Sequence, residues 1–327
     1  MPAIYDREED NVYISTRELV EYVSRGGDIG AKDSRGNKNG GTIVSHKLWQ
    51  KKPNILDAYA FTTIADGTKI TVYSYPECLH KTESGYSLDY IRTVDYPLDL
   101  LDNGELEITL KEAVCTGYVI CQRLGLTQIE ACVTFYREDK DEERSFKQIL
   151  ELEDLRGNFE LLIALFSPFA KIIKEKGSKV TGQLSFLKFP FKGGAREGQR
   201  DFIIDAFRAI KSHKRLVVQA PTGTGKTMAS LYPALKSVGT GDADKIFYFT
   251  GKTTTALSAL NAIDIMRDQI PDLRSIHISS KDKCCVSFKP GQRRKCEPKY
   301  CHRTKSYFEK INVALLELLE NHRTYTK

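Results

Sequence analysis

One short stretch, RLVVQAPTGTGKTMASLYPAL, constrains the fold of this 327-residue chain more than any other part of it. An apolar run ends at Gln219-Ala220, a turn with two glycines follows, and Lys226-Thr227 opens a helical pattern. Glycines let backbone N–H groups curl around phosphate oxygens, and the new helix points its positive end at the same anion. The stretch therefore predicts a strand–turn–helix unit that binds a nucleotide phosphate.

The side chains of this loop have expected roles in binding ATP and Mg²⁺. Lys226 reaches the β- and γ-phosphates, and the Thr227 hydroxyl ligates Mg²⁺, which makes these two residues the catalytic candidates. The whole phosphate cradle is expected to comprise Pro221, Thr222, Gly223, Thr224, Gly225, Lys226 and Thr227.

Strand-like and helix-like patterns alternate around this loop. Such alternation is typical of a parallel, doubly wound α/β sheet. We expect helices at 198–212, 226–237 and 254–269, and strands at 215–220, 245–250 and 274–279.

The first segment, which runs to about residue 187, indicates an α+β or α/β domain around a small sheet. Ser15-Thr16 predicts a capped amphipathic helix, and six glycines between 25 and 41 indicate a loop. Turn signals at Asp66-Gly67 and at 83–85 separate strand patterns. We expect strands at 58–64, 69–75, 88–94 and 129–137, and helices at 107–124 and 146–176.

A second Gly-Lys-Thr sequence, at 251–253, follows the predicted strand 245–250. It lacks the upstream glycines, so we do not interpret it as a second nucleotide site. Loops at the carboxyl ends of parallel strands bind ligands, and Lys252, Thr253 and Thr254 suit a nucleic-acid phosphate. A helix start capped by threonine explains the same residues and remains an alternative.

The eight cysteines fall into two groups. Cysteines 78, 115, 121 and 132 stand among apolar neighbours, as small buried hydrophobic residues do, whereas 284, 285, 296 and 301 lie within eighteen residues. No apolar run is long enough to cross a bilayer, and the acidic start lacks a signal-peptide core. We therefore expect a cytoplasmic protein without membrane contact, in which cysteines do not form disulfides.

The net charge of +6 is concentrated in one segment. Residues 281–310 contain ten Lys/Arg and three Asp/Glu, interleaved with Phe288, Tyr300, Tyr307 and Phe308. Basic and aromatic side chains together favour binding to single-stranded nucleic acid, although a solvated basic face is the alternative.

With these residues in view, the chain from about 190 to 327 resembles the iron–sulfur superfamily 2 DNA helicases of the DinG/XPD type. The resemblance rests on FPFKGGAREGQ (189–199), APTGTGKT (220–227), IFYFTGKTTT (246–255) and the cysteines after SSKDK (279–283). It implies that Arg196 and Gln199 help to place the adenine. It also implies that the segment after the second strand contacts single-stranded or forked DNA, in repair or replication.

The same resemblance implies a 4Fe–4S cluster held by Cys285, Cys296 and Cys301. The fourth ligand of bacterial relatives comes later in the chain, beyond Lys327, and Cys284 is a possible substitute. Zinc held by the three cysteines and His302 is the alternative.

Two departures from that family affect the expected activity. No Asp-Glu pair follows Thr227, the only such pair being Asp141-Glu142, and no second motor domain follows. We therefore expect the N-terminal part of a longer protein, or a truncated relative, that binds ATP weakly and does not unwind DNA. The expected domains are 1–187, 188–280 for the first RecA-like motor domain, and 281–327 for a truncated cysteine-rich insertion.

The first segment resembles, less specifically, a PD-(D/E)xK nuclease-like domain. The matching places are Glu77 and Tyr90-Ile91-Arg92, but a tyrosine cannot replace a metal carboxylate and an arginine stays protonated. Asp89 is one residue off and would face the other side of its strand, and only Tyr118 matches the downstream helix. We expect a degenerate nuclease fold used for contacts. An active metal-dependent nuclease and a nucleotide-responsive DNA-binding adaptor remain alternatives.

Overall fold

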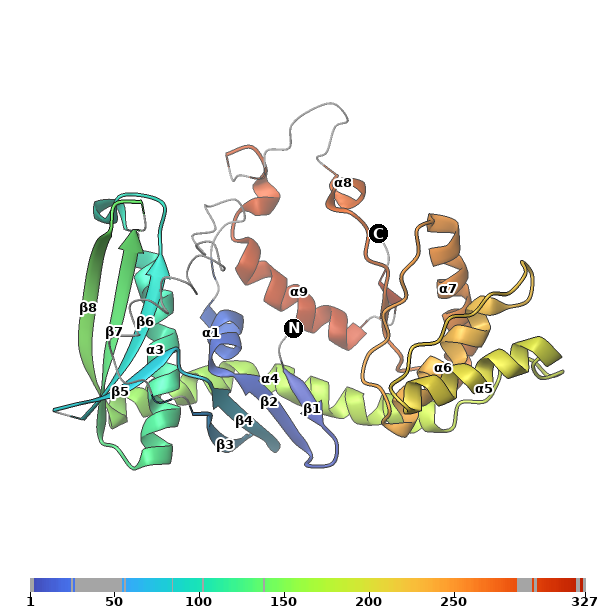
Figure 1. Ribbon diagram of the computed structural model, residues 1–327, viewed down its shortest axis with the longest axis horizontal. Coiled ribbons are helices and arrows are strands. Elements are labelled where there is room, and N and C mark those ends of the chain that lie inside the picture. Colours follow the sequence, from blue (N-terminus) through green and yellow to red (C-terminus); the bar gives the residue numbers. More distant parts are fainter. Residues whose placement is uncertain are drawn as a thin grey trace. The chain divides into compact units, whose positions relative to one another are not determined.

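The computed structural model describes residues 3–24, 26, 55, 57–83, 85–101, 103–137, 139–286, 296, 299–321 and 324–325 (Figure 1). These divide into two compact units. Unit 1 comprises Met1–Lys174 and Ser287–Glu317, and unit 2 comprises Glu175–Val286 and Leu318–Lys327. The glycine-rich loop predicted at 25–41 lies outside the described residues except for Gly26. The boundaries predicted from the sequence, after residue 187 between the nuclease-like and motor domains and after residue 280 before the cysteine-rich insertion, stay a prediction.

Unit 1 is built on two mixed, four-stranded sheets (Figure 1). The first has the order β1-β2-β4-β3, with bounds Ile4–Asp6, Asn11–Ser15, Thr68–Ser74 and Tyr59–Ala65. The second has the order β5-β6-β7-β8, with bounds Cys78–Thr82, Gly85–Thr93, Gln128–Arg137 and Glu142–Glu151. In each sheet the central pair runs parallel and the outer pairs run antiparallel. The four predicted strands are confirmed, and β1, β2, β5 and β8 are added to them.

A tight turn sets the register of β3 against β4. Asp66 and Gly67 have φ angles of 48° and 71°, the two positive values that a type I′ hairpin requires. In the resulting register Thr62 faces Thr71, and their hydroxyl oxygens lie 2.8 Å apart. The turn predicted from the Asp-Gly pair is therefore confirmed.

Helix α3 (Asn103–Leu124) packs against both sheets of unit 1, and α1 (Thr16–Ser24) packs against α3. The predicted cap of α1 is present, because the Glu18 N–H donates to Ser15 Oγ at 3.3 Å. Between helices and sheets lies an apolar core whose largest fully buried members are Tyr90, Phe135, Phe159, Phe166, Phe169, Ile14, Leu19, Ile70, Leu79, Leu88, Ile120 and Ile129. A short helix, η1, covers Leu98–Leu100.

The helix predicted at 146–176 is wrong at its beginning. Residues up to Glu151 form β8, which pairs with β7 along its whole length, and only then does α4 (Leu152–Ser185) begin. The error has a physical reason: nearly every residue of β8 except Leu150 is exposed, so no alternation of apolar and polar residues marks it as a strand.

Unit 2 is organised around α5 (Glu197–Lys211), α6 (Lys226–Thr240) and α7 (Thr253–Met266). Its buried core consists of Leu184, Leu187, Met228, Leu231, Leu235, Val238, Ala259, Ala262, Met266 and Ile270. Its other elements are η2 Arg267–Gln269, β9 Ser275–Ile276, α8 Lys281–Cys284 and β10 Thr324–Tyr325. The helices η3 His302–Thr304 and α9 Tyr307–Asn321 belong to unit 1, except for the last residues of α9 from Leu318 on.

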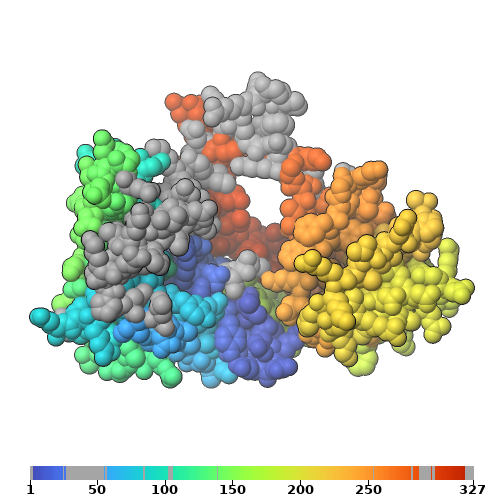
Figure 2. All heavy atoms as spheres, viewed as in Figure 1, coloured from blue at the N-terminus to red at the C-terminus, as the bar shows by residue number. Residues whose placement is uncertain are grey.

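The predicted α/β class is confirmed, but two predicted strands of unit 2 are not formed. Residues 215–220 and 245–250 are not strands, and among the described residues β9 pairs only with β10, in parallel. A strand exists only through hydrogen bonds to a neighbour. Without one, Val217 and Phe249 keep 96% and 90% of their surfaces exposed. Figure 2 shows unit 2 mostly in yellow and orange.

Candidate nucleotide site and the polar centre of unit 1

The phosphate loop has the backbone conformation that its glycines permit. Gly223 and Gly225 have φ angles of 82° and 72°, in the left-handed region that residues with a Cβ rarely adopt. Gly225 is also the N-cap of α6, and no side chain caps that helix. The first backbone N–H groups of α6 are therefore left to bind an anion, as phosphate sites at helix starts require.

The Lys226 side chain folds back onto the loop that precedes it. Its ammonium donates to the carbonyl oxygens of Ala220, at 2.9 Å, and Pro221, at 2.5 Å. Thr224 Oγ1 donates to the same Pro221 carbonyl at 2.9 Å. The ammonium is thus held at the loop by neutral carbonyl oxygens. A phosphate anion would be a stronger hydrogen-bond acceptor for the ammonium and would replace them.

Gln199 of α5 lies directly against the phosphate loop. Its Nε2 donates to the Gly225 carbonyl at 3.2 Å, and its Oε1 accepts from the Arg196 backbone N–H at 3.4 Å. A Cβ at Gly225 would lie 2.4 Å from Gln199 Nε2, so this contact also requires glycine. The structure therefore brings together Gln199, Arg196 and the loop, which lie about 25 residues apart in the sequence.

The second Gly-Lys-Thr sequence begins α7. Lys252 is the N-cap residue, and its backbone N–H donates to Thr250 Oγ1 at 3.1 Å. A threonine therefore supports this turn, but from a position two residues before the N-cap. Lys252 and Thr254 are exposed at the helix start, while the Thr253 side chain lies outside the described residues.

The two groups of cysteines differ as expected in burial. Cysteines 78, 115, 121 and 132 are buried, and burial raises the pKa of Cys121 to about 11 and that of Cys115 further. Cys284 is exposed, and Cys285, Cys296 and Cys301 are half-buried. Cys285 belongs to unit 2, whereas Cys296 and Cys301 belong to unit 1. That these three cysteines together bind a metal group therefore stays a prediction.

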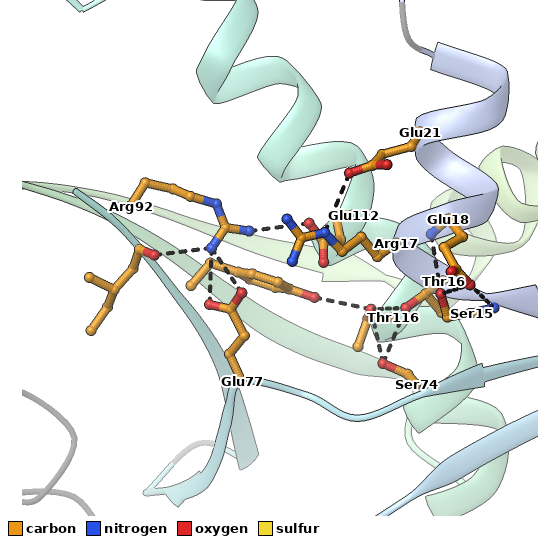
Figure 3. Close-up of polar contacts among 12 residues, drawn as sticks. Ser15, Thr16, Arg17, Glu18, Glu21, Ser74, Glu77, Arg92, Glu112 and Thr116 are labelled. Atoms are coloured by element: carbon orange, nitrogen blue, oxygen red, sulfur yellow. Dashed lines mark hydrogen bonds and ion pairs between the residues drawn. The ribbon is translucent and has the colours of Figure 1, made fainter. Parts of the chain in front are cut away.

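An arginine lies at the place where the nuclease resemblance puts its metal. Arg92 Nη1 donates to both carboxylate oxygens of Glu77, at 2.9 and 3.0 Å, and Nη2 donates to Glu112 Oε2 at 3.1 Å (Figure 3). The guanidinium carbon also lies 5.2 Å from the Tyr90 ring centroid. Both carboxylates already share one fixed cation, Arg92, so these residues do not fit a Mg²⁺ site.

Tyr90 belongs to a buried hydroxyl network centred on Thr116 and is not placed as a metal ligand. Its hydroxyl donates to Thr116 Oγ1 of α3 at 3.0 Å, and Thr116 donates in turn to Thr16 at 3.0 Å (Figure 3). Ser74 of β4 joins the same network. Burial holds the pKa of Tyr90 well above its ordinary value, so the phenol stays neutral and donates.

Sequence reasoning found Glu77 and Arg92 but missed Glu112. Glu112 lies on α3, one turn before Thr116, and no motif spacing links it to either partner. Burial raises its pKa above the ordinary value, and the neighbouring Arg92 acts against that rise. Tyr118, expected as a nuclease residue, is instead a core side chain stacked on Phe159 at a centroid distance of 4.4 Å.

Comparison with known proteins finds a similarity to helicases in the second part of the chain. Residues 202–321 match the DEAD/DEAH box helicase family. This range includes the phosphate loop, α7 and the cysteine-rich segment. The expected similarity to helicases is thereby confirmed for this range, while the iron–sulfur type and the nuclease-like domain remain proposals.

Two individual proteins are also similar. A 48-residue stretch is 44% identical to the probable ATP-dependent helicase MJ0942 of Methanocaldococcus jannaschii, over 15% of this chain and 7% of that protein's length. The chain therefore matches only a small part of this relative. A solved structure described as "Crystal structure of SSO0001" aligns with 49% of this chain and 78% of its own, at 12% identity and a TM-score of 0.29.

Proposed function

We propose that this chain is the ATP-binding and DNA-binding portion of an ATP-dependent DNA helicase of the iron–sulfur type, acting in repair or replication in the cytoplasm. The observation that carries the proposal is the loop at 221–227, with its two left-handed glycines, uncapped helix and adjacent Gln199. The DEAD/DEAH box match, which includes the loop but begins after Gln199, supports it.

The loop residues fit a magnesium nucleotide. The α6 amides would hold phosphate oxygens, and the Lys226 ammonium would leave its carbonyl partners for the β- and γ-phosphates. Thr227, half-buried in the first turn of α6, would offer its hydroxyl to Mg²⁺. Arg196 and Gln199 would border the adenine from the start of α5.

Binding, rather than unwinding, is the activity proposed for these residues. Hydrolysis in this class needs a carboxylate beside the magnesium ion, and residues 228–327 contain no Asp-Glu pair. Binding of ATP is accordingly the step proposed for the loop residues 221–227.

The DNA contacts proposed are Lys252, Thr253 and Thr254 at the start of α7, together with the basic segment 281–310. Exposure of the Lys252 side chain supports the first contact. The net +7 of that segment supports the second. Single-stranded or forked DNA is the proposed form.

A 4Fe–4S cluster on Cys285, Cys296 and Cys301 is the cofactor proposed for the cysteine-rich segment, with zinc as the alternative. These three cysteines are partly exposed, as ligands of a bound metal group are, whereas cysteines that only fill the core are fully buried. Anaerobically purified protein should be brown and contain iron. A colourless preparation with about one zinc per chain would favour the alternative.

The proposed function is tested by isothermal titration of the full chain with ATP and Mg²⁺. Lys226→Ala should lose binding by a factor of about 100, because the lysine supplies the main cationic contact. Lys214→Ala, an exposed lysine of the same unit, should bind like the wild type. Equal affinities in all three proteins would refute the nucleotide site.

A further inference from the structure

A second polar cluster lies on the opposite side of the β5–β8 sheet from α3. Cys78 and His80 stand two residues apart on edge strand β5, so their side chains share one face. Asp89 of β6 pairs directly with Cys78 across the strands. The neighbouring residue Tyr90 points the other way, to Thr116 of α3. Strand register therefore brings a thiol, an imidazole and a carboxylate together.

The donor atoms of these three residues are spaced like ligands around one ion. His80 Nδ1 lies 4.0 Å from Cys78 Sγ and 3.7 Å from Asp89 Oδ2, and the three donor atoms lie within 4.8 Å of one another. Tetrahedral zinc, with bonds of about 2.0–2.3 Å, separates such atoms by about 3.4–3.6 Å. The two distances from His80 Nδ1 would contract by about half an ångström or less, and the distance between Cys78 Sγ and the Asp89 carboxylate, which is at most 4.8 Å, by at most about 1.3 Å.

The three residues are buried, so a bound cation would offset the cost of placing negative charge among them. The exposed fractions are 0% for Cys78, 4% for Asp89 and 9% for His80. A thiolate and a carboxylate are costly at this depth unless a positive charge compensates them. Ser87 donates to Asp89 Oδ1 at 2.7 Å, which fixes the carboxylate and leaves Oδ2 on the side of His80.

We propose that Cys78, His80 and Asp89 form a zinc site that fastens the edge strand β5 to β6. Thiolate, imidazole and carboxylate together suit zinc, whereas magnesium and calcium prefer oxygen ligands alone. Binding would release the Cys78 thiol proton to solvent, and a water molecule would take the fourth position. The site is independent of the nucleotide loop and of the cysteines after residue 283.

Zinc at this site would affect the ion pair of Glu77 with Arg92, because Glu77 immediately precedes the short strand β5. The strand has five residues, and β6 is its neighbour in the sheet. Glu77 precedes Cys78 and meets Arg92 on the α3 face. Zinc on one face would thus hold the backbone that positions the ion pair on the other.

Cobalt binding by the full chain tests the proposal directly. Cysteines 284, 285, 296 and 301 are first changed to Ser, so that they cannot bind the probe. Titration with Co²⁺ should then give a thiolate-to-cobalt charge-transfer band that saturates at about one equivalent. Cys78→Ser should abolish this band. Cys115→Ser, which removes another fully buried thiol of unit 1, should leave it intact.

Thermal unfolding provides the second readout. In the same background, Zn²⁺ at about a hundredfold excess over Kd should raise Tm by about 5–10 °C. His80→Asn and Asp89→Asn should lose this rise. The absence of a cobalt band in the folded background protein would overturn the proposal, whether or not Cys78→Ser folds. A band that survives Cys78→Ser in a folded variant would overturn it equally.

Discussion

Arg92 donates from a single nitrogen to both carboxylate oxygens of Glu77, at 2.9 and 3.0 Å, and reaches Glu112 with its other terminal nitrogen. Three charges of alternating sign are thereby joined, from β6, from the residue before β5 and from α3. The place that resembles a metal-binding centre is therefore an ion cluster of Arg92, Glu77 and Glu112. This cluster determines how the stability of unit 1 should respond to mutation and pH.

Removing the guanidinium should destabilise unit 1 strongly. Arg92→Ala leaves two carboxylates without their cation, at side-chain exposures of 28% and 14%, and should cost about 3 kcal/mol near pH 7. Urea unfolding of the full chain measures this loss. Lys111→Ala breaks an exposed pair with Glu107 in the same unit and should leave the free energy of unfolding nearly unchanged.

The cost of Arg92→Ala should shrink as the pH falls. Burial raises the folded-state pKa of Glu112, so the penalty for its charge is felt above that pKa and is relieved below it. Loss of Arg92 removes an opposing effect and raises that pKa further. The variant should therefore approach the wild type between about pH 7 and pH 5. A loss that grows on acidification would contradict this assignment.

The same ion cluster predicts that unit 1 does not cleave DNA with divalent metals. Because Arg92 already holds both Glu77 and Glu112 in ion pairs, Mg²⁺ or Mn²⁺ would have to displace the guanidinium to bind there. Incubation of the full chain with labelled DNA and either metal should leave the DNA intact. Metal-dependent degradation that survives Lys226→Ala but fails in Glu77→Ala would show an active nuclease.

Gly225→Ala should weaken ATP binding by a factor of about 10 or more. The new Cβ would meet Gln199 Nε2 at 2.4 Å, and a φ of 72° costs a residue with a side chain about 1–2 kcal/mol. Gly193→Ala, where a Cβ meets nothing within 4 Å, is the matched control and should bind normally. The loop assignment fails if the two variants bind ATP alike.

Two helical glycines of unit 2 should respond in opposite directions to alanine. A Cβ at Gly239 of α6 would lie 2.4 Å from the Leu184 backbone carbon, so Gly239→Ala should destabilise by about 2 kcal/mol or more. A Cβ at Gly182 of α4 meets nothing within 4 Å, so Gly182→Ala should stabilise by about 0.5–1 kcal/mol. Thermal unfolding compares them. A Tm for Gly239→Ala at or above that of Gly182→Ala would contradict this packing.

Local signals in the sequence predicted local structure well. The phosphate loop, the Asp66-Gly67 hairpin and the Ser15 cap each depend on a few adjacent residues, and each is present. Exposed β8 escaped prediction because its partner β7, rather than its own pattern, makes it a strand. Conversely, the apolar pattern at 215–220 predicts a strand whose neighbours the described residues do not supply.

Side-chain clusters that depend on strand register could not be read from the sequence. Cys78 was interpreted as a small buried hydrophobe, and it is buried, but its nearness to His80 and Asp89 arises from the pairing of β5 with β6. Glu112 reaches Arg92 only because α3 packs on β6. Both relationships join residues that carry no common motif.

The measurement that tests the account most directly compares the affinities of ATP and AMP for the full chain and for Lys226→Ala. The loop and Lys226 are proposed to hold the β- and γ-phosphates, which AMP lacks. The wild type should therefore prefer ATP by a factor of about 100, and Lys226→Ala should lose most of that preference. Equal binding of ATP and AMP by the wild type, or an unchanged preference in the variant, would contradict the account.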